Sequence, residues 1–144
     1  MFLVSGGFRE LIEPVAKELN ISSEDIFANQ LRFDKTSGEY AGFDESQPTS
    51  ESGGKPRVIA MVKEKYSIDE VTMIGDGNSA PPPPKNSIMH NKVTHHHPIG
   101  ATDLEARPPA SYFIGFGGNV AREKVKEGAD HFVYHFDELS ALLR

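Results

Sequence analysis

The sequence predicts an α/β protein in which parallel strands alternate with helices. Short apolar runs of strand length recur along the chain, and segments with helical spacing of apolar residues accompany them. Glycine or a capping residue separates the runs from the helices that follow. This alternation puts helices on both faces of a parallel sheet, so we expect a three-layer fold. The apolar runs are residues 1–4, 71–74, 112–116 and 131–135.

The first unit is a strand, a glycine turn and a helix. Residues 1–4 run into Ser5-Gly6-Gly7, and apolar residues then recur at helical spacing from Phe8 to Leu19. Pro14 removes one backbone donor inside this helix, so we expect a kink or an irregular turn just before it.

A hairpin and a second helix follow this unit. Residues 30–33 and 39–43 flank a Thr-Ser-Gly turn, and they predict an antiparallel pair of strands. Gly53-Gly54-Lys55-Pro56 then opens a helix that runs to about Tyr66. Proline is tolerated there because the first helical turn does not use its N–H.

The C-terminal part repeats the alternation twice. After the strand at 112–116, Asn119 is the expected N-cap of a helix that Gly128 ends. A short strand at 131–135 follows, and Asp137 is expected to cap the last helix.

One segment, residues 78–100, breaks this pattern. It contains four consecutive prolines and three adjacent histidines, and it shows no apolar periodicity. We therefore expect a disordered or polyproline insertion within a single domain that spans 1–144. Histidines can bind metal ions, so His90 and residues 95–97 are either a metal site or a solvated tract, and the lack of a rigid scaffold favours the solvated tract.

Composition narrows the class of protein. The 144 residues are 38% hydrophobic and carry a formal charge of −6, which suits one globular domain and offers no basic surface for nucleic acid. No apolar run approaches the roughly 20 residues of a membrane span. The chain has no cysteine, which fits a reducing compartment. We expect a cytoplasmic protein without nucleic-acid or membrane partners.

Ser5-Gly6-Gly7 is a candidate anion site. Where a parallel strand turns into a helix, free backbone N–H groups and the helix dipole point at one spot, and Ser5 adds a hydroxyl donor. An ordinary glycine turn explains the same three residues.

Two charged residues lie at similar boundaries. Lys55 starts a helix, where a cation could pair the oxygens of a transferring phosphoryl group; alone, it also fits a solvated lysine. Asp76 ends a buried strand between two glycines, which suits either a Mg²⁺ ligand or a turn.

Taken in order, these motifs resemble those of the haloacid dehalogenase superfamily. A Ser-Gly-Gly after a strand, a lysine at a helix start and a Gly-Asp-Gly after the next strand are similar to its second, third and fourth motifs. Longer stretches resemble the phosphoserine phosphatase family in particular, and the similarity covers residues 1–77 and 101–144. The matching stretches are residues 2–9, 27–29, 38–44, 52–55, 73–77, 101–103 and 113–119.

The resemblance implies a Rossmann-like core and a Mg²⁺-dependent hydrolase of serine biosynthesis. Such an enzyme converts O-phospho-L-serine to L-serine and phosphate through an aspartyl-phosphate intermediate. It is compatible with a homodimer. By the same resemblance, Ser5, Gly6 and Gly7 bind the substrate phosphate, and Lys55 is a catalytic residue that pairs phosphate and nucleophile. Asp76 is expected to hold Mg²⁺, Thr102 to contact substrate and Asp103 to be a second acidic metal residue.

Two departures from the family pattern affect activity. Nothing in the chain matches the family's Asp-x-Asp-x-Thr, whose first aspartate is the nucleophile. We therefore expect the first strand of the family's core, and the cap that covers its active site, to be missing. Asp34-Lys35-Thr36 resembles a P-type ATPase motif but lies in the predicted hairpin. In addition, residues 78–100 separate Gly77 from Ala101, which are adjacent in the family. We therefore expect the chain alone to be inactive; the alternative function is that of an inactive splice form or fragment with a binding role.

Overall fold

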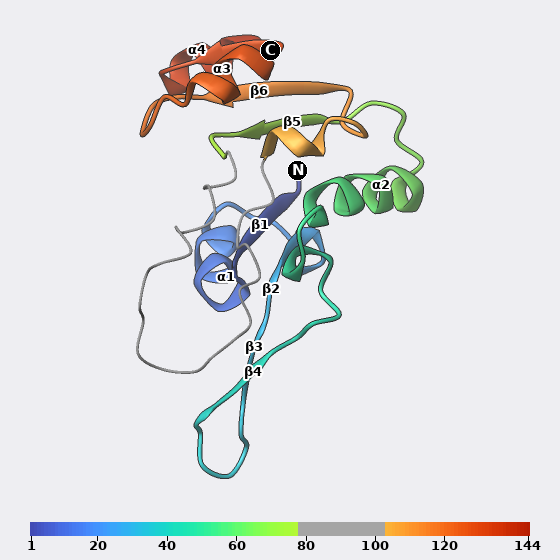
Figure 1. The fold of residues 1–144 in the computed structure, drawn as a ribbon, viewed down its shortest axis with the longest axis vertical. Coiled ribbons are helices and arrows are strands. Elements are labelled where there is room, and N and C mark those ends of the chain that lie inside the picture. The colour runs from blue at the N-terminus through green and yellow to red at the C-terminus, as the bar shows by residue number, and fades with distance from the viewer. Residues whose placement is uncertain (78–102) are drawn as a thin grey trace, which may run out of the picture.

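The computed structural model of the chain describes residues 1–77 and 103–144 (Figure 1). The prediction for residues 78–100, and with it the prediction for Thr102, lies outside these ranges.

The described residues form two parallel sheets and one hairpin. Strand β1 (Leu3–Phe8) pairs in parallel with β2 (Ile26–Asn29). Strands β5 (Thr72–Gly75), β6 (Tyr112–Phe116) and β7 (His131–Val133) form a second parallel sheet in that order. The predicted α/β class is confirmed.

The N-terminal unit buries one face of its helix. Helix α1 (Arg9–Glu18) runs without interruption through Pro14. Its inner side packs Ala16 against Ile26 and Ala28 of β2, and all three are buried. The Ser-Gly-Gly residues lie inside strand β1, and α1 begins only at Arg9. The prediction that these residues form a turn at the start of the helix is therefore wrong.

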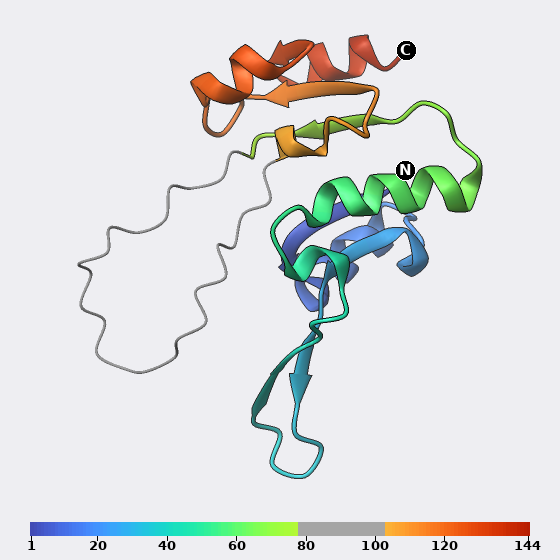
Figure 2. The same cartoon turned by 45° about the vertical axis from the view of Figure 1, so that its right-hand side comes forward.

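The predicted hairpin is present and projects away from the rest of the molecule (Figure 2). It consists of β3 (Leu31–Phe33) and β4 (Tyr40–Phe43), paired antiparallel. In its loop the Asp34 carboxylate accepts hydrogen bonds from the backbone N–H groups of Thr36 (2.9 Å) and Ser37 (2.7 Å). Asp34 therefore acts as a turn-forming residue.

The second sheet is covered on both faces. Helix α2 (Gly54–Tyr66), the short helix η3 (Asp103–Ala106) and helix α3 (Glu123–Gly128) share a buried core with Met73 and Phe113. Helix α4 (Phe136–Leu142) lies over the opposite face, where its Phe136 ring stacks on Phe116 at 4.5 Å between centroids. Since side chains alternate along a strand, this division follows from the period of two residues.

Two predicted helix caps are wrong. Helix α3 begins at Glu123 after Arg122, not after Asn119, because the chain leaving β6 first continues along β7 through a bond from Gly117 N to Val133 O (2.8 Å). Helix α4 begins after His135, not Asp137.

The cap of α4 follows from one carboxylate that the sequence pattern did not single out. The Glu138 carboxylate reaches back to the backbone N–H groups of Tyr134 (2.9 Å) and His135 (3.4 Å). This contact closes a capping box two residues earlier than an Asp137 cap would, so Asp137 falls inside the first helical turn.

The two parallel sheets remain separate. Within residues 1–77 and 103–144, no strand lies between β1 and β5, and the two strands are not hydrogen-bonded to each other. Helix α2 contacts both halves: it packs against β1 on one side and η3 on the other. The arrangement agrees with the incomplete core that the family resemblance implies.

No helix in the described part of the chain is both long enough and apolar enough to cross a membrane.

The base of the hairpin holds a carboxylate with a lowered pKa. Asp44 accepts hydrogen bonds from Gln47 Nε2 (3.0 Å), Ser46 Oγ (2.8 Å) and Arg32 Nη2 (2.8 Å). The bond from Gln47, followed by those from Ser46 and the charge of Arg32, lowers the pKa of Asp44 from 3.8 to about 2. A folded-state pKa below the unfolded value stabilises the protein above about pH 4, and this contribution is lost as the pH falls toward 2.

We predict that an NMR titration of the Asp44 carboxyl carbon will have its midpoint near pH 2. Replacement of the strongest donor in Gln47→Met should move the midpoint upward, toward the ordinary value of 3.8. Arg32→Met should move it less, because the charge of Arg32 contributes least to the lowered pKa. A midpoint near 3.8 in the unmodified chain would show that these contacts do not persist in solution.

Candidate active site

The catalytic lysine expected from the family resemblance is held at the start of α2 by two glycines. Gly53 has φ 76°, a left-handed conformation that glycine adopts without strain. A Cβ on Gly54 would lie 2.1 Å from the carbonyl oxygen of Pro48, so only glycine allows the helix to start this close to the preceding segment. Lys55 is thereby fixed in the first turn of α2.

Lys55 forms a buried ion pair with Asp103. Its Nζ contacts Asp103 Oδ1, and the two side chains are only 13% and 8% exposed. The second oxygen of Asp103 accepts a hydrogen bond from the Gly77 backbone N–H at 2.6 Å. Both oxygens of this carboxylate are therefore engaged.

The same carboxylate explains the glycines on either side of Asp76. A Cβ on Gly75 would lie 2.2 Å from Asp103 Oδ2, and one on Gly77 would lie 2.6 Å from it. The Gly-Asp-Gly sequence leaves room for the Asp103 side chain to cross the end of β5. The structure thus places the Lys55–Asp103 pair beside the Gly75–Gly77 segment that carries Asp76.

Asp76 keeps a more open position than Asp103. Its side chain is 46% exposed, and Oδ2 lies 3.5 Å from Arg122 Nη1. The same guanidinium also donates to the carbonyl oxygen of Asp76. The sequence analysis missed Arg122, and the only signal available was its place after β6, next to β5, since adjacent parallel strands bring their carboxyl ends together.

The Ser-Gly-Gly segment forms a second group of polar contacts. Ser5 Oγ accepts a hydrogen bond from Gly7 N (3.0 Å), and the Gly6 carbonyl accepts one from Asn29 Nδ2 (2.8 Å). Within the described residues, no hydrogen bond joins this segment to Lys55, Asp76 or Asp103. Helix α2, which carries Lys55, contacts both β1 and η3, which begins at Asp103.

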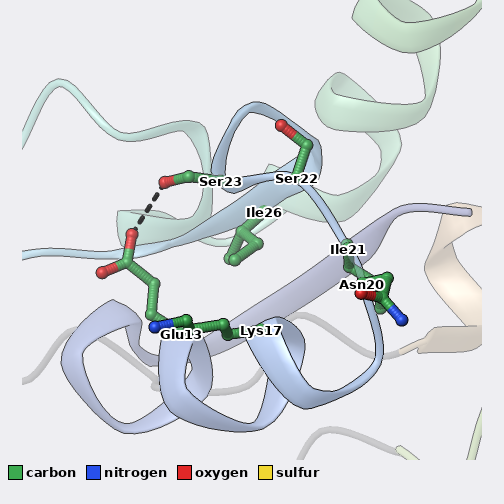
Figure 3. A pocket seen from close by; sticks show the side chains of 7 residues that line it. All are labelled: Glu13, Lys17, Asn20, Ile21, Ser22, Ser23 and Ile26. Carbon is green, nitrogen blue, oxygen red and sulfur yellow. Dashed lines mark hydrogen bonds between the residues drawn. The ribbon is translucent and has the colours of Figure 1, made fainter.

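A pocket of about 540 Å³ lies elsewhere, between the C-terminal half of α1 and residues 20–26 (Figure 3). Its carboxylate, Glu13, already accepts hydrogen bonds from Ser23 Oγ (2.8 Å) and Arg9 Nη1 (3.1 Å). These bonds, the one from Ser23 first, hold the pKa of Glu13 below its ordinary value. The Glu13 carboxylate thus links α1 to the following segment through its hydrogen bond from Ser23.

The arrangement of strands and motifs defines a class of protein. The three motifs that resemble those of the superfamily lie within or at the ends of three elements of an α/β fold. The Ser-Gly-Gly lies in β1, the lysine at the start of α2 and the Gly-Asp-Gly at the end of β5. This order of motifs on a parallel α/β fold is that of the haloacid dehalogenase type.

Comparisons with known proteins identify one family within this class. The chain is 48% identical over 143 residues to phosphoserine phosphatase from Bos taurus and 48% identical over 139 residues to that from Homo sapiens. These alignments cover 99% and 96% of the chain but 53% and 51% of the relatives. The resemblance to the phosphoserine phosphatase family is therefore confirmed, and the chain spans about half the length of these curated relatives.

A solved structure agrees with the sequence comparison. The chain matches a phosphoserine phosphohydrolase-like protein from Francisella tularensis with a TM-score of 0.69 and 29% identity, over 99% of this chain and 55% of that one. No protein-family model matches the chain. The roles of Ser5, Lys55, Asp76 and Asp103 stay predictions, and Thr102 lies outside the described residues.

The packing of Asp103 against glycine generates a stability prediction. Gly75→Ala places a methyl group against the Asp103 carboxylate and should lower the free energy of unfolding by about 1 to 3 kcal/mol. Gly6→Ala is the matched control, because its Cβ meets nothing within 4 Å, and it should change stability by no more than about 0.5 kcal/mol. Urea denaturation of both variants measures the difference, and equal midpoints would contradict the proposed packing.

Proposed function

We propose that this chain forms the phosphate- and metal-binding half of a phosphoserine phosphatase active site. The reaction is hydrolysis of O-phospho-L-serine to L-serine and phosphate, a step of serine biosynthesis in the cytoplasm. One observation carries the proposal: the Lys55–Asp103 ion pair lies beside Asp76 at the end of β5, in a chain 48% identical to phosphoserine phosphatases.

The residues of this half bind and orient the phosphate. The Ser5 hydroxyl accepts from Gly7 N, which leaves its own hydrogen available for a phosphate oxygen. Lys55 offers a positive charge to another oxygen of the same group, and Asp103 fixes its ammonium in place. Donors that are fixed before the substrate arrives stabilise developing charge without further reorganisation.

The donor set fits Mg²⁺ through Asp76. Proteins often hold Mg²⁺ with only one or two carboxylates, the remaining ligands being water and substrate phosphate. Asp76 supplies an accessible carboxylate of this kind, although no cluster of three metal-binding side chains occurs in the described ranges. When bound, the ion neutralises charge on the transferring phosphoryl group. Because Lys55 and Gly77 occupy both Asp103 oxygens, we infer that Asp103 positions Lys55 and that Asp76 is the metal ligand.

The family's nucleophile motif has no counterpart in these 144 residues. The sequence contains no Asp-x-Asp-x-Thr, and the lookalike Asp34 lies in the hairpin loop with its carboxylate bonded to its own turn. The backbone N–H of Ser37, followed by that of Thr36, holds the pKa of Asp34 below its ordinary value. Loss of a nucleophile lowers kcat by on the order of 10⁶ in a serine protease, and we expect a similar deficit for the chain alone.

An inactive fragment is the alternative function, and the comparisons do not favour it over the enzyme. A product that lacks the strand between β1 and β5 would retain phosphate binding without turnover, and would then act as an inactive splice form or binding fragment.

Phosphate release from phosphoserine in the presence of Mg²⁺ separates the two functions. We predict no turnover by the unmodified chain, and turnover once a family segment bearing Asp-x-Asp-x-Thr is joined to its N-terminus and residues 78–100 are removed. Retention of those residues should suppress activity, because they separate Asp76 from Thr102.

Two variants serve as controls for this assay. Replacement of the first aspartate of the added segment by asparagine should abolish turnover, and Lys55→Met, measured only if circular dichroism shows that the variant is folded, should lower it strongly. Turnover by the unmodified chain that disappears in Asp34→Asn would instead place the nucleophile in the hairpin.

A further inference from the structure

Strand β1 carries a bulge at the Ser-Gly-Gly segment. Val4 pairs with Phe27 and Phe8 with Asn29, so three residues on β1 stand opposite the single residue Ala28 on β2. The ladder is interrupted there, and the Gly6 carbonyl receives a side-chain partner in place of a backbone one. That partner is Asn29, whose Nδ2 donates to it at 2.8 Å.

This hydrogen bond sets the direction of the next N–H group. The Gly6 carbonyl and the Gly7 N–H belong to one trans peptide, so they point in opposite directions. When Asn29 holds the carbonyl on the side of β2, the Gly7 N–H turns toward Ser5 Oγ, 3.0 Å away. Asn29 therefore fixes the Gly6–Gly7 peptide, whose N–H bonds to Ser5 Oγ, and so orients the Ser5 hydroxyl without touching the phosphate.

Thr49 holds the Asn29 amide in turn. Its hydroxyl donates to Asn29 Oδ1 at 2.9 Å, and Thr49 is only 8% exposed. A flipped amide would place Oδ1 against the Gly6 carbonyl, which repels it, so the two contacts admit one orientation.

Thr49 also belongs to the segment that packs against the start of α2. It lies in the short helix η2 (Pro48–Ser50), which contacts β1, β2 and α2. Gly54 sits against the Pro48 carbonyl, one residue before Lys55. The path from Ser5 through Asn29 and Thr49 therefore ends beside the lysine.

We propose that Asn29 and Thr49 are positioning residues that hold the Ser-Gly-Gly bulge in its anion-binding shape and in register with Lys55. The proposal rests on the proposed function for its ligand, a phosphate group. It adds two residues that act through Gly6 and Gly7.

The first test measures the shape of the bulge without a ligand. In ¹H–¹⁵N spectra of the whole chain, Thr49→Val should shift the Gly7 resonance and speed its amide exchange at least about fivefold, whereas Thr49→Ser, which keeps the hydroxyl, should preserve both. Ser50→Ala is the matched control, because it removes a hydrogen bond from the same short helix to Glu45 O (3.0 Å) without touching Asn29. An unchanged Gly7 signal in folded Thr49→Val and Asn29→Asp variants would overturn the proposal.

The second test measures binding of inorganic phosphate by calorimetry. Asn29→Asp removes the donor to Gly6 and should weaken binding about tenfold or more, the factor that one lost hydrogen bond of about 1.4 kcal/mol produces. Thr49→Val should weaken it severalfold, and the double variant should bind no worse than Asn29→Asp, since both act through one amide. Equal weakening in Ser50→Ala would show a merely structural role. A wild-type chain that binds no phosphate, with the Gly7 shift still present in Thr49→Val, would overturn the proposed function and leave the positioning role standing.

Discussion

The buried ion pair between Lys55 and Asp103 is the contact on which the rest of the C-terminal half depends. It joins the first turn of α2 to η3, and η3 lies against β5. Breaking one partner of a buried pair costs about 3 to 5 kcal/mol, a large share of the roughly 5 to 15 kcal/mol that stabilises a whole domain. The pair also dictates the glycines at 75 and 77, because the Asp103 carboxylate occupies the space of their side chains.

Apolar and polar contacts together relate the two halves of the molecule. One hydrophobic cluster surrounds Ala16 and Ile26, and a second surrounds Phe113 and Val125. Helix α2 lies between them with Val58 and Val62 fully buried, and η2 contacts β1, β2 and α2. The position of the Ser-Gly-Gly bulge relative to Lys55 therefore depends on directional hydrogen bonds such as that from Thr49 to Asn29 as well as on core burial.

The sequence predicted most strands, helix α2 and the hairpin because glycine and apolar periodicity are local signals. It misplaced the starts of α3 and α4, since the Gly117–Val133 bond and the reach of Glu138 depend on chain geometry and not on the usual cap residues. The family resemblance, and not spacing, implied that Lys55, Asp76 and Asp103 belong to one site. The sequence could not indicate Arg122 or Thr49, because their partners lie 46 and 20 residues away and leave no spacing pattern.

The position of β6 has a consequence for where the chain resists opening. Among the strands that the structure describes, β6 alone has a hydrogen-bonded neighbour on each side, while β1, β5 and β7 each have one free edge. Phe113, the second residue of β6, is fully buried. Backbone amides paired on both sides and shielded from water open last. The most persistent structural unit of the described residues is therefore the C-terminal βαβ segment, whereas the Ser-Gly-Gly bulge belongs to the more easily opened part.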